Sequence, residues 1–336
     1  MTAHCPLPRR GLLWHAGSPR TTLALLALLG GLVLLRPGGW PLALPLAALA
    51  LNLLAALLRH PAFRRQVPLL VAHLALLALL VGVALGRLLA LDGHFELTQG
   101  LPFDGQLIDR QAGPLHVDRL QQLAFRHDGF EIDYAPGRKR GATRNAVTWL
   151  GDDGQPRSAV IGDHRPLVLH GHRLYTSPNK GFAPLLRWEP TAGAPVRGAV
   201  HLPSFPVHEL RQSREWQLPD GRSVWELLQT DEALIDPARA TRFSLPAQHR
   251  LVVRVDQQRG ELAPGETLVL PGGILVYEGL RTWMGYRVAY DPTLPWLLAA
   301  ALLSALALGV HYVRKFWPGR PATLAQPVGA AGVLDG

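Results

Sequence analysis

The sequence has 336 residues, of which 48% are hydrophobic and 18% charged, and its formal net charge is +9 at pH 7. Many of the basic residues flank the apolar stretches, and no lysine- or arginine-rich block is interleaved with aromatics. The positive charge therefore does not indicate nucleic-acid binding. Cys5 is the only cysteine, which excludes an intramolecular disulfide, a CxxC redox motif and a CxxCH motif.

The chain begins with a basic tail, residues 1–20, and a first apolar stretch over Thr21–Leu35. Proline and glycine in the turn 36–39 stop a helix there. A second apolar stretch, Trp40–Leu58, follows at once. A cleaved signal peptide would be followed by a soluble chain, so the first stretch is interpreted as an uncleaved helix.

The third apolar stretch, Val67–Ala90, is interrupted only by Arg87 and is long enough to span a bilayer as a helix. The fourth, Leu294–Val313, lies near the end of the chain and is followed by basic residues. The sequence therefore predicts a membrane protein with four transmembrane α-helices, three within residues 21–90 and one over 293–314.

The basic residues also predict the orientation of these helices. They cluster in the N-terminal tail, in the loop 59–66 and after the last span. With four spans these segments share one side, which is cytoplasmic by the positive-inside rule. We thus expect a multi-pass protein of the bacterial inner (cytoplasmic) membrane with both termini cytoplasmic and residues 91–292 outside. The cytoplasmic tail 315–336 is rich in proline, alanine and glycine and is expected to be disordered.

The sequence pattern of the external region, 91–292, predicts a large β-rich domain. Short alternating apolar runs are separated by turn residues, which is typical of an antiparallel sandwich or barrel. Only Ser223–Thr230 is expected to be helical. The predicted strands include residues 130–134, 146–150, 166–169, 249–255, 267–270 and 273–277.

Motifs for common enzyme chemistries are missing from the sequence. It contains no Walker loop, Rossmann glycine pattern, HExxH or GxSxG, and the carboxylates of 91–292 are scattered, which argues against a hydrolase. Three histidines lie close together, His164, His170 and His172. Gly171 predicts a turn between the last two, so solvated turn histidines are favoured over a metal site.

His73 lies in the third apolar stretch among Leu, Val and Ala neighbours, where water cannot solvate it. Imidazole can ligate iron, and it can also donate a hydrogen bond to a neighbouring helix. The sequence alone leaves both readings open. His311, just before Arg314, is a weaker intramembrane ligand candidate, and both histidines fall toward the cytoplasmic ends of their helices.

Three stretches carry a family resemblance: Phe130-Glu-Ile-Asp-Tyr134, Pro166-Leu-Val-Leu-His-Gly-His-Arg-Leu-Tyr175-Thr-Ser177 and Trp283-Met-Gly-Tyr-Arg-Val-Ala-Tyr-Asp291-Pro292. With three spans, a β-rich external domain and one final span, the chain resembles the ResB (CcsB) proteins of system II cytochrome c biogenesis. His73 matches the transmembrane histidine of that family, which is implicated in holding haem. The chain departs from the family at Asp163, where an asparagine often precedes the Pro-Leu motif.

The resemblance implies a subunit that, with a CcsA/ResC-type membrane partner, moves haem outward and attaches it to apocytochrome c. His73 would bind the haem iron, and His311 is the less favoured second ligand. The partner's tryptophan-rich motif is absent here, so at most the chain is part of a haem lyase (cytochrome c synthetase) complex. A separate thioredoxin-like protein would reduce the client cysteines. The alternatives are a membrane-anchored scaffold that does not touch haem and an extracytoplasmic sensor or ligand-binding module.

Overall fold

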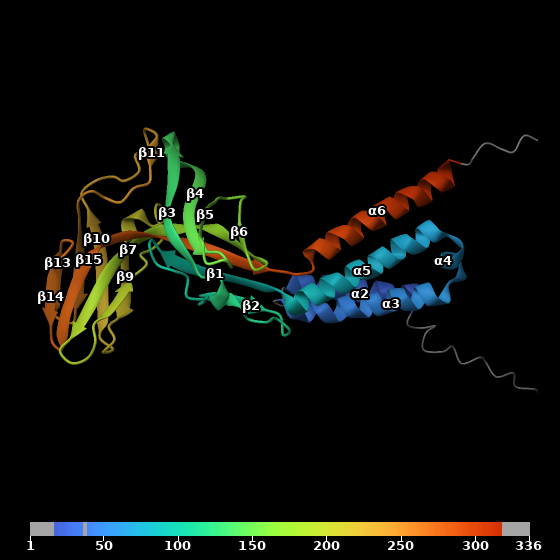
Figure 1. The fold of residues 1–336 in the computed structure, drawn as a ribbon, viewed down its shortest axis with the longest axis horizontal. Helices are drawn as coiled ribbons and strands as arrows, with labels where there is room; N and C mark the ends of the chain where they lie inside the picture. The colour runs from blue at the N-terminus through green and yellow to red at the C-terminus, as the bar shows by residue number, and fades with distance from the viewer. Residues whose placement is uncertain (1–16, 36–38, 318–336) are drawn as a thin grey trace, which may run out of the picture. The chain divides into compact units, whose positions relative to one another are not determined.

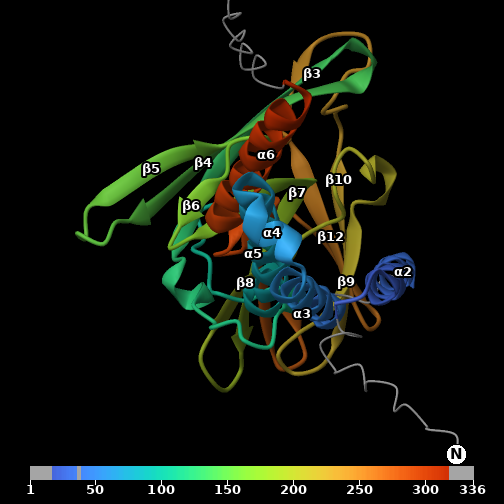
Figure 2. The same ribbon diagram turned by 90° about the vertical axis from the view of Figure 1, so that its right-hand side faces the viewer.

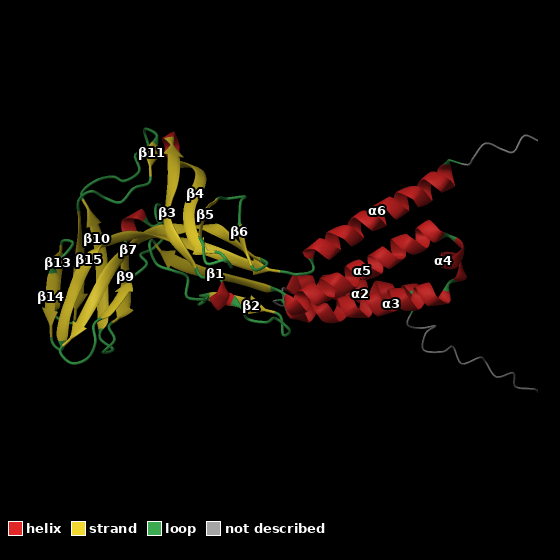
Figure 3. Cartoon of the chain, viewed as in Figure 1, coloured by secondary structure: helices red, strands yellow, loops and turns green. Residues whose placement is uncertain are grey.

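The computed structural model describes residues 17–35 and 39–317. The chain divides into a helical unit, which runs up to Arg87 and resumes at Thr293, and a β-rich unit, Leu88–Pro292 (Figures 1 and 3). Cys5, most of the N-terminal tail, the turn 36–38 and the tail from 318 onward lie outside the described residues, so the expectations for them stay predictions.

Among the described residues, the helical unit contains four longer helices and two short ones. Three segments have the length and apolar composition of membrane spans: Trp40–Arg59, Val67–Leu89 and Leu294–Phe316. The first helix has 17 residues, which gives about 25 Å against a hydrocarbon core of about 30 Å. The helical prediction thus holds for three spans, and a fourth span at α2 stays a prediction. The elements are α2 (Pro19–Leu35), η1 (Trp40–Leu42), α3 (Ala43–Arg59), α4 (Pro61–Arg65), α5 (Val67–Leu89) and α6 (Leu294–Phe316).

A polar contact joins the first two long helices. The Thr22 hydroxyl on α2 donates a hydrogen bond of 2.7 Å to the Asn52 side-chain oxygen on α3. Asn52 is buried among apolar neighbours, where an unpaired amide would be costly. This contact therefore helps to fix how α2 lies against α3.

The β-rich unit is built on a seven-stranded antiparallel sheet. Its order is β2-β1-β15-β7-β6, with β14 also paired to β15 and β8 to β7. The two long strands, β7 and β15, form its centre and run through the whole unit. Their bounds and those of their neighbours are β1 (Leu91–Thr98), β2 (Asp109–Ala112), β6 (Leu167–Leu169), β7 (His172–Pro190), β8 (Val196–Ala199), β14 (Thr267–Leu270) and β15 (Gly273–Tyr290).

Two four-stranded antiparallel sheets pack against the long one. The first has the order β11-β3-β4-β5 and the second β13-β12-β10-β9. Figure 2 shows β4 and β5 side by side, with β5 at the edge of its sheet. The strands are β3 (Phe125–Ala135), β4 (Lys139–Leu150), β5 (Pro156–Ile161), β9 (Ser213–Gln217), β10 (Ser223–Thr230), β11 (Thr241–Arg242), β12 (His249–Val255) and β13 (Gln258–Leu262).

Three apolar cores hold these sheets together. One lies between the β1 end of the long sheet and the β3–β5 sheet, and includes Phe95, Phe125 and Tyr286. A second lies between the other end of the long sheet and the β9–β13 sheet, and includes Trp188 and Tyr277. A third core joins the two smaller sheets in the middle. The predicted β-rich domain with antiparallel strand pairing is confirmed, and the two long strands are shared by both halves.

The chain enters and leaves the β-rich unit on neighbouring strands. Strand β1 follows α5 after Ala90, and β15 precedes α6 by three residues. These strands pair antiparallel, with Leu91 opposite Tyr290. The two connections to the helical unit therefore leave the sheet side by side.

The helix expected over Ser223–Thr230 is wrong, because this segment is strand β10. Its side chains alternate between buried and more exposed positions, with Val224, Glu226 and Leu228 buried. The sequence predicted a helix here because glutamate and leucine favour helices. Pairing on both sides, with β9 and β12, overrides that preference.

Glu226 is fully buried in this strand and accepts a hydrogen bond of 3.1 Å from the Trp216 indole. Burial raises its pKa to about 8, so the folded protein holds a proton here that the unfolded chain releases above its ordinary pKa. The stability contributed by that proton is present at pH 4 and is lost as the pH rises toward 8. We expect Glu226→Gln to flatten this decline. Thermal unfolding of both proteins at pH 5 and pH 8 tests the prediction, and parallel pH dependences would contradict it.

Candidate functional site

His73 lies on α5 two turns from its start and is half-buried. Its Nδ1 is 2.8 Å from the backbone carbonyl oxygen of Leu69, four residues earlier on the same helix. A carbonyl oxygen only accepts, so Nδ1 carries the proton and donates. In the neutral ring this leaves the lone pair on Nε2, the atom able to bind a metal.

Phe63 on α4 packs against the His73 ring. The two ring centroids are 4.6 Å apart with an interplanar angle of 56°. With the Leu69 hydrogen bond, this contact holds the imidazole in one orientation. Sequence reasoning did not identify Phe63, because α4 is a separate short helix between two apolar stretches.

His311 lies on α6 at a groove of ≈ 490 Å³. The other lining residues come from the end of α4, the start of α5 and the end of α6, and none is acidic: Arg65, Gln66, Val67, Pro68, Arg314 and Lys315. The groove therefore has the charge to receive an anionic group. In the sequence these basic residues were interpreted only as signals of membrane orientation. Their position around one groove depends on how α5 and α6 pack.

The structure does not bring His73 and His311 to one level. The Ser304 hydroxyl on α6 donates a 3.4 Å hydrogen bond to the carbonyl oxygen of Ala72, so His73 is level with Ser304. His311 is seven residues further along α6, a rise of roughly 10 Å. The two rings are therefore not placed at the same depth along the helices.

His164, His170 and His172 do not form a three-residue metal-binding group. His170 and Gly171 have positive φ angles of 46° and 80°, which confirms the predicted turn. His164 and His170 are exposed, whereas His172 is buried, contrary to its expected solvation. Over residues 17–35 and 39–317, no group of three or more His, Cys, Asp or Glu is arranged to hold a metal ion.

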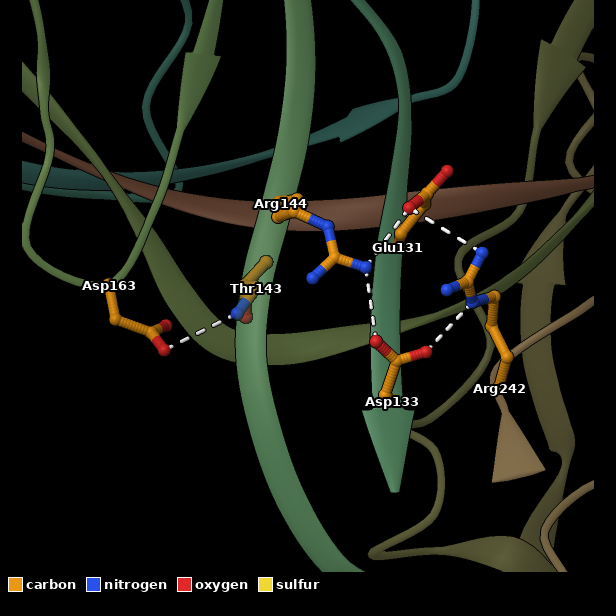
Figure 4. A network of polar contacts seen from close by, with 6 residues as sticks. All are labelled: Glu131, Asp133, Thr143, Arg144, Asp163 and Arg242. Atoms are coloured by element: carbon orange, nitrogen blue, oxygen red, sulfur yellow. Dashed lines mark hydrogen bonds and ion pairs between the residues drawn. The ribbon is translucent and has the colours of Figure 1, made fainter. Parts of the chain in front are cut away.

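A charged network crosses the face of the β3–β4 sheet (Figure 4). The Arg144 guanidinium contacts Glu131 at 3.1 Å and Asp133 at 3.0 Å, and Arg242 contacts Asp133 at 2.8 Å. Hydrogen bonds from Arg242 and Arg144 lower the pKa of Asp133 below its ordinary value. Two acids and two bases neutralise one another here, so the network ties β11, β3 and β4 together rather than forming a charged binding surface.

A second polar group, buried in the β-rich unit, was also missed from the sequence. The Asn145 side chain donates to His127 Nδ1 at 2.8 Å and to the Gly129 carbonyl at 3.1 Å, and it accepts from the Tyr286 hydroxyl at 2.7 Å. His127, Asn145 and Tyr286 are fully buried. In the sequence they look like ordinary polar positions, because β-bulges shift the alternation of β3 near His127.

Three helices fit to span a membrane and a separate β-rich unit define a membrane-associated protein that carries a large β-rich domain. The chain belongs to the ResB-like family, whose model matches residues 62–318. The resemblance seen in the sequence is thus confirmed, and the membership supports a role in cytochrome c biogenesis.

Among solved structures, the chain is similar to one named "Cytochrome c Heme Lyase CcmF", with 15% sequence identity and a TM-score of 0.25. The match covers 95% of this chain and 36% of that one, so this chain spans little over a third of the length of the larger protein. No curated protein matches the sequence.

Proposed function

We propose that this protein is a subunit of a system II cytochrome c maturation complex that helps deliver haem across the membrane and attach it to apocytochrome c. The observation that carries the proposal is the state of His73: a ring within a membrane span, oriented by Leu69 and Phe63, with Nε2 available. Metal-binding histidines commonly donate their other ring N–H to a backbone carbonyl in this way.

In this proposal the haem site is shared between two proteins. His73 supplies one axial nitrogen to the haem iron, and a CcsA/ResC-type membrane partner supplies the second. The depth difference between His73 and His311 favours a ligand from the partner over one from α6. The basic groove at His311 suits the carboxylates of an anionic amphiphile such as haem at the end of the span.

The chemistry of attachment also calls for other proteins. Thioether formation needs reduced cysteines on apocytochrome c, and Cys5 is the only thiol of this chain. The proposal therefore includes a thioredoxin-like reductant in the same pathway. It also includes α2 as the fourth span, cytoplasmic termini and an extracytoplasmic β-rich unit, in the inner membrane of a bacterium.

The proposal is tested by co-expressing the chain with its partner and purifying the complex. We expect the complex to contain haem and His73→Ala to lower the haem content severalfold, with partial recovery when imidazole is added to the buffer. The matched control is His94→Ala, which removes an exposed histidine of the β-rich unit. If the variant complex assembles with unchanged haem content, the ligand role is wrong and the chain is a scaffold for its partner.

A further inference from the structure

Three aromatic rings meet at the end of the β-rich unit where its chain connections lie. His116 follows β2, His172 is the first residue of β7 and Tyr290 is the last residue of β15. The two imidazole centroids are 6.4 Å apart with planes at 87°. The Tyr290 ring is 5.5 Å from His116 and stacks on His172 at 4.6 Å.

The hydrogen bonds of the two imidazoles determine where their protons are. His116 Nδ1 is 2.9 Å from the carbonyl oxygen of Leu89, and His172 Nδ1 is 3.2 Å from that of His170. Both Nδ1 atoms therefore donate, and in neutral rings both Nε2 atoms carry lone pairs. Burial, and then the neighbouring His116, hold the pKa of His172 below its ordinary value.

Both Nε2 atoms are buried and neither has a hydrogen-bond partner. His172 as a whole is only 2% exposed. Unpartnered buried polar atoms are rare and cost free energy. Two lone pairs cannot satisfy each other, so each Nε2 needs an electron-poor partner, either a hydrogen-bond donor or a metal ion.

A metal ion meets this requirement at the observed spacing. With a metal–nitrogen bond of about 2.0 Å, each ring centroid lies about 3 Å from the ion, so two rings on opposite sides have centroids about 6 Å apart. The 6.4 Å between the ring centroids of His116 and His172 is close to that spacing. Donation of each Nδ1–H to a backbone carbonyl is also the usual outer contact of a histidine ligand.

The residues around the two imidazoles indicate which metal ion fits between them. Zinc sites need three or four protein ligands, and the part of the chain described by the structure gathers no such group. Burying a single positive charge between neutral rings costs less than burying two. A haem macrocycle between the rings would need the space beside them that the Tyr290 ring fills.

We propose that His116 and His172 bind one monovalent copper ion in a two-coordinate site at this end of the β-rich unit. The site is independent of His73 and of the proposed haem function. Binding needs no change of oxidation state, and in neutral rings that donate through Nδ1 both Nε2 atoms offer lone pairs.

The test uses the full-length protein in detergent with Cys5→Ser, which removes the only thiol as a competing ligand. Copper(I) is supplied anaerobically as its acetonitrile complex and competed against bicinchoninate. We expect the parent protein to bind one equivalent of copper(I). His116→Ala or His172→Phe should weaken this binding at least about tenfold, since even the loss of an outer contact of a metal site changes the affinity that much. His172→Phe keeps a ring against Tyr290, and His164→Ala, which removes an exposed histidine, should have no effect.

X-ray absorption of the copper-loaded protein should show two nitrogen ligands. The proposal is overturned if the parent protein holds no such equivalent, because that result does not depend on how the variants fold. It is also overturned if both variants bind copper as the parent does, or if the variants lose haem but not copper.

Discussion

Asn145→Ala is expected to lower the free energy of unfolding of the β-rich unit by roughly 3–5 kcal/mol, because it removes the partner of two buried groups, His127 and Tyr286, and a third hydrogen bond to Gly129. The amide now donates to His127 Nδ1 and to the Gly129 carbonyl and accepts from the Tyr286 hydroxyl. Burial lowers the pKa of His127 to about 4, so the ring is neutral and its Nδ1 can accept. Thermal or denaturant unfolding of the full chain, followed by tryptophan fluorescence, measures the loss.

Two further variants separate lost hydrogen bonds from lost volume. Tyr286→Phe removes one hydroxyl and should cost less than Asn145→Ala, roughly 1–2 kcal/mol. Thr148→Ala, on the same strand, removes only a long 3.4 Å hydrogen bond to Asp128 and should change stability by less than about 0.5 kcal/mol. If Asn145→Ala were no more harmful than Thr148→Ala, the network would not hold β3, β4 and β15 together.

The sequence predicted the fold where one local pattern was enough. Apolar length alone defined α5 and α6, and β12 and β14 were predicted with the bounds that they have in the structure. Gly273–Tyr277 was recognised only as the first part of β15, because its β-bulge between Tyr277 and Gly279 interrupts the alternation. Ser223–Thr230 was missed because a strand paired on both sides can carry helix-favouring residues.

The candidate site was predictable only in part, because much of it depends on contacts that no local pattern encodes. A histidine without polar neighbours stands out in an apolar helix, so His73 was found from the sequence. Its Leu69 hydrogen bond and its contact with Phe63 depend on a rotamer and on the short helix α4. The offset of His311 follows from the contact between Ser304 and Ala72, which no local pattern encodes.

Replacing His73 with another ligand tests the proposed iron bond more directly than removing it. His73→Cys keeps a metal-binding atom in the span but changes its chemistry from imidazole nitrogen to thiolate sulfur, which donates more electron density to haem iron. Because Leu69 and Phe63 orient the existing ring, we expect this single change to alter the iron and to leave assembly with the partner intact. Leu74→Cys, one residue away on an exposed face of α5, is the matched control.

The decisive measurement is the electron paramagnetic resonance spectrum of the ferric, partner-bound complex for the parent, His73→Cys and Leu74→Cys proteins. The proposed ligation predicts that His73→Cys alone loses the parent's bis-nitrogen signal, through a changed axial ligand or loss of haem. Identical ferric spectra and equal haem content in all three complexes would show that His73 is not a ligand of the iron.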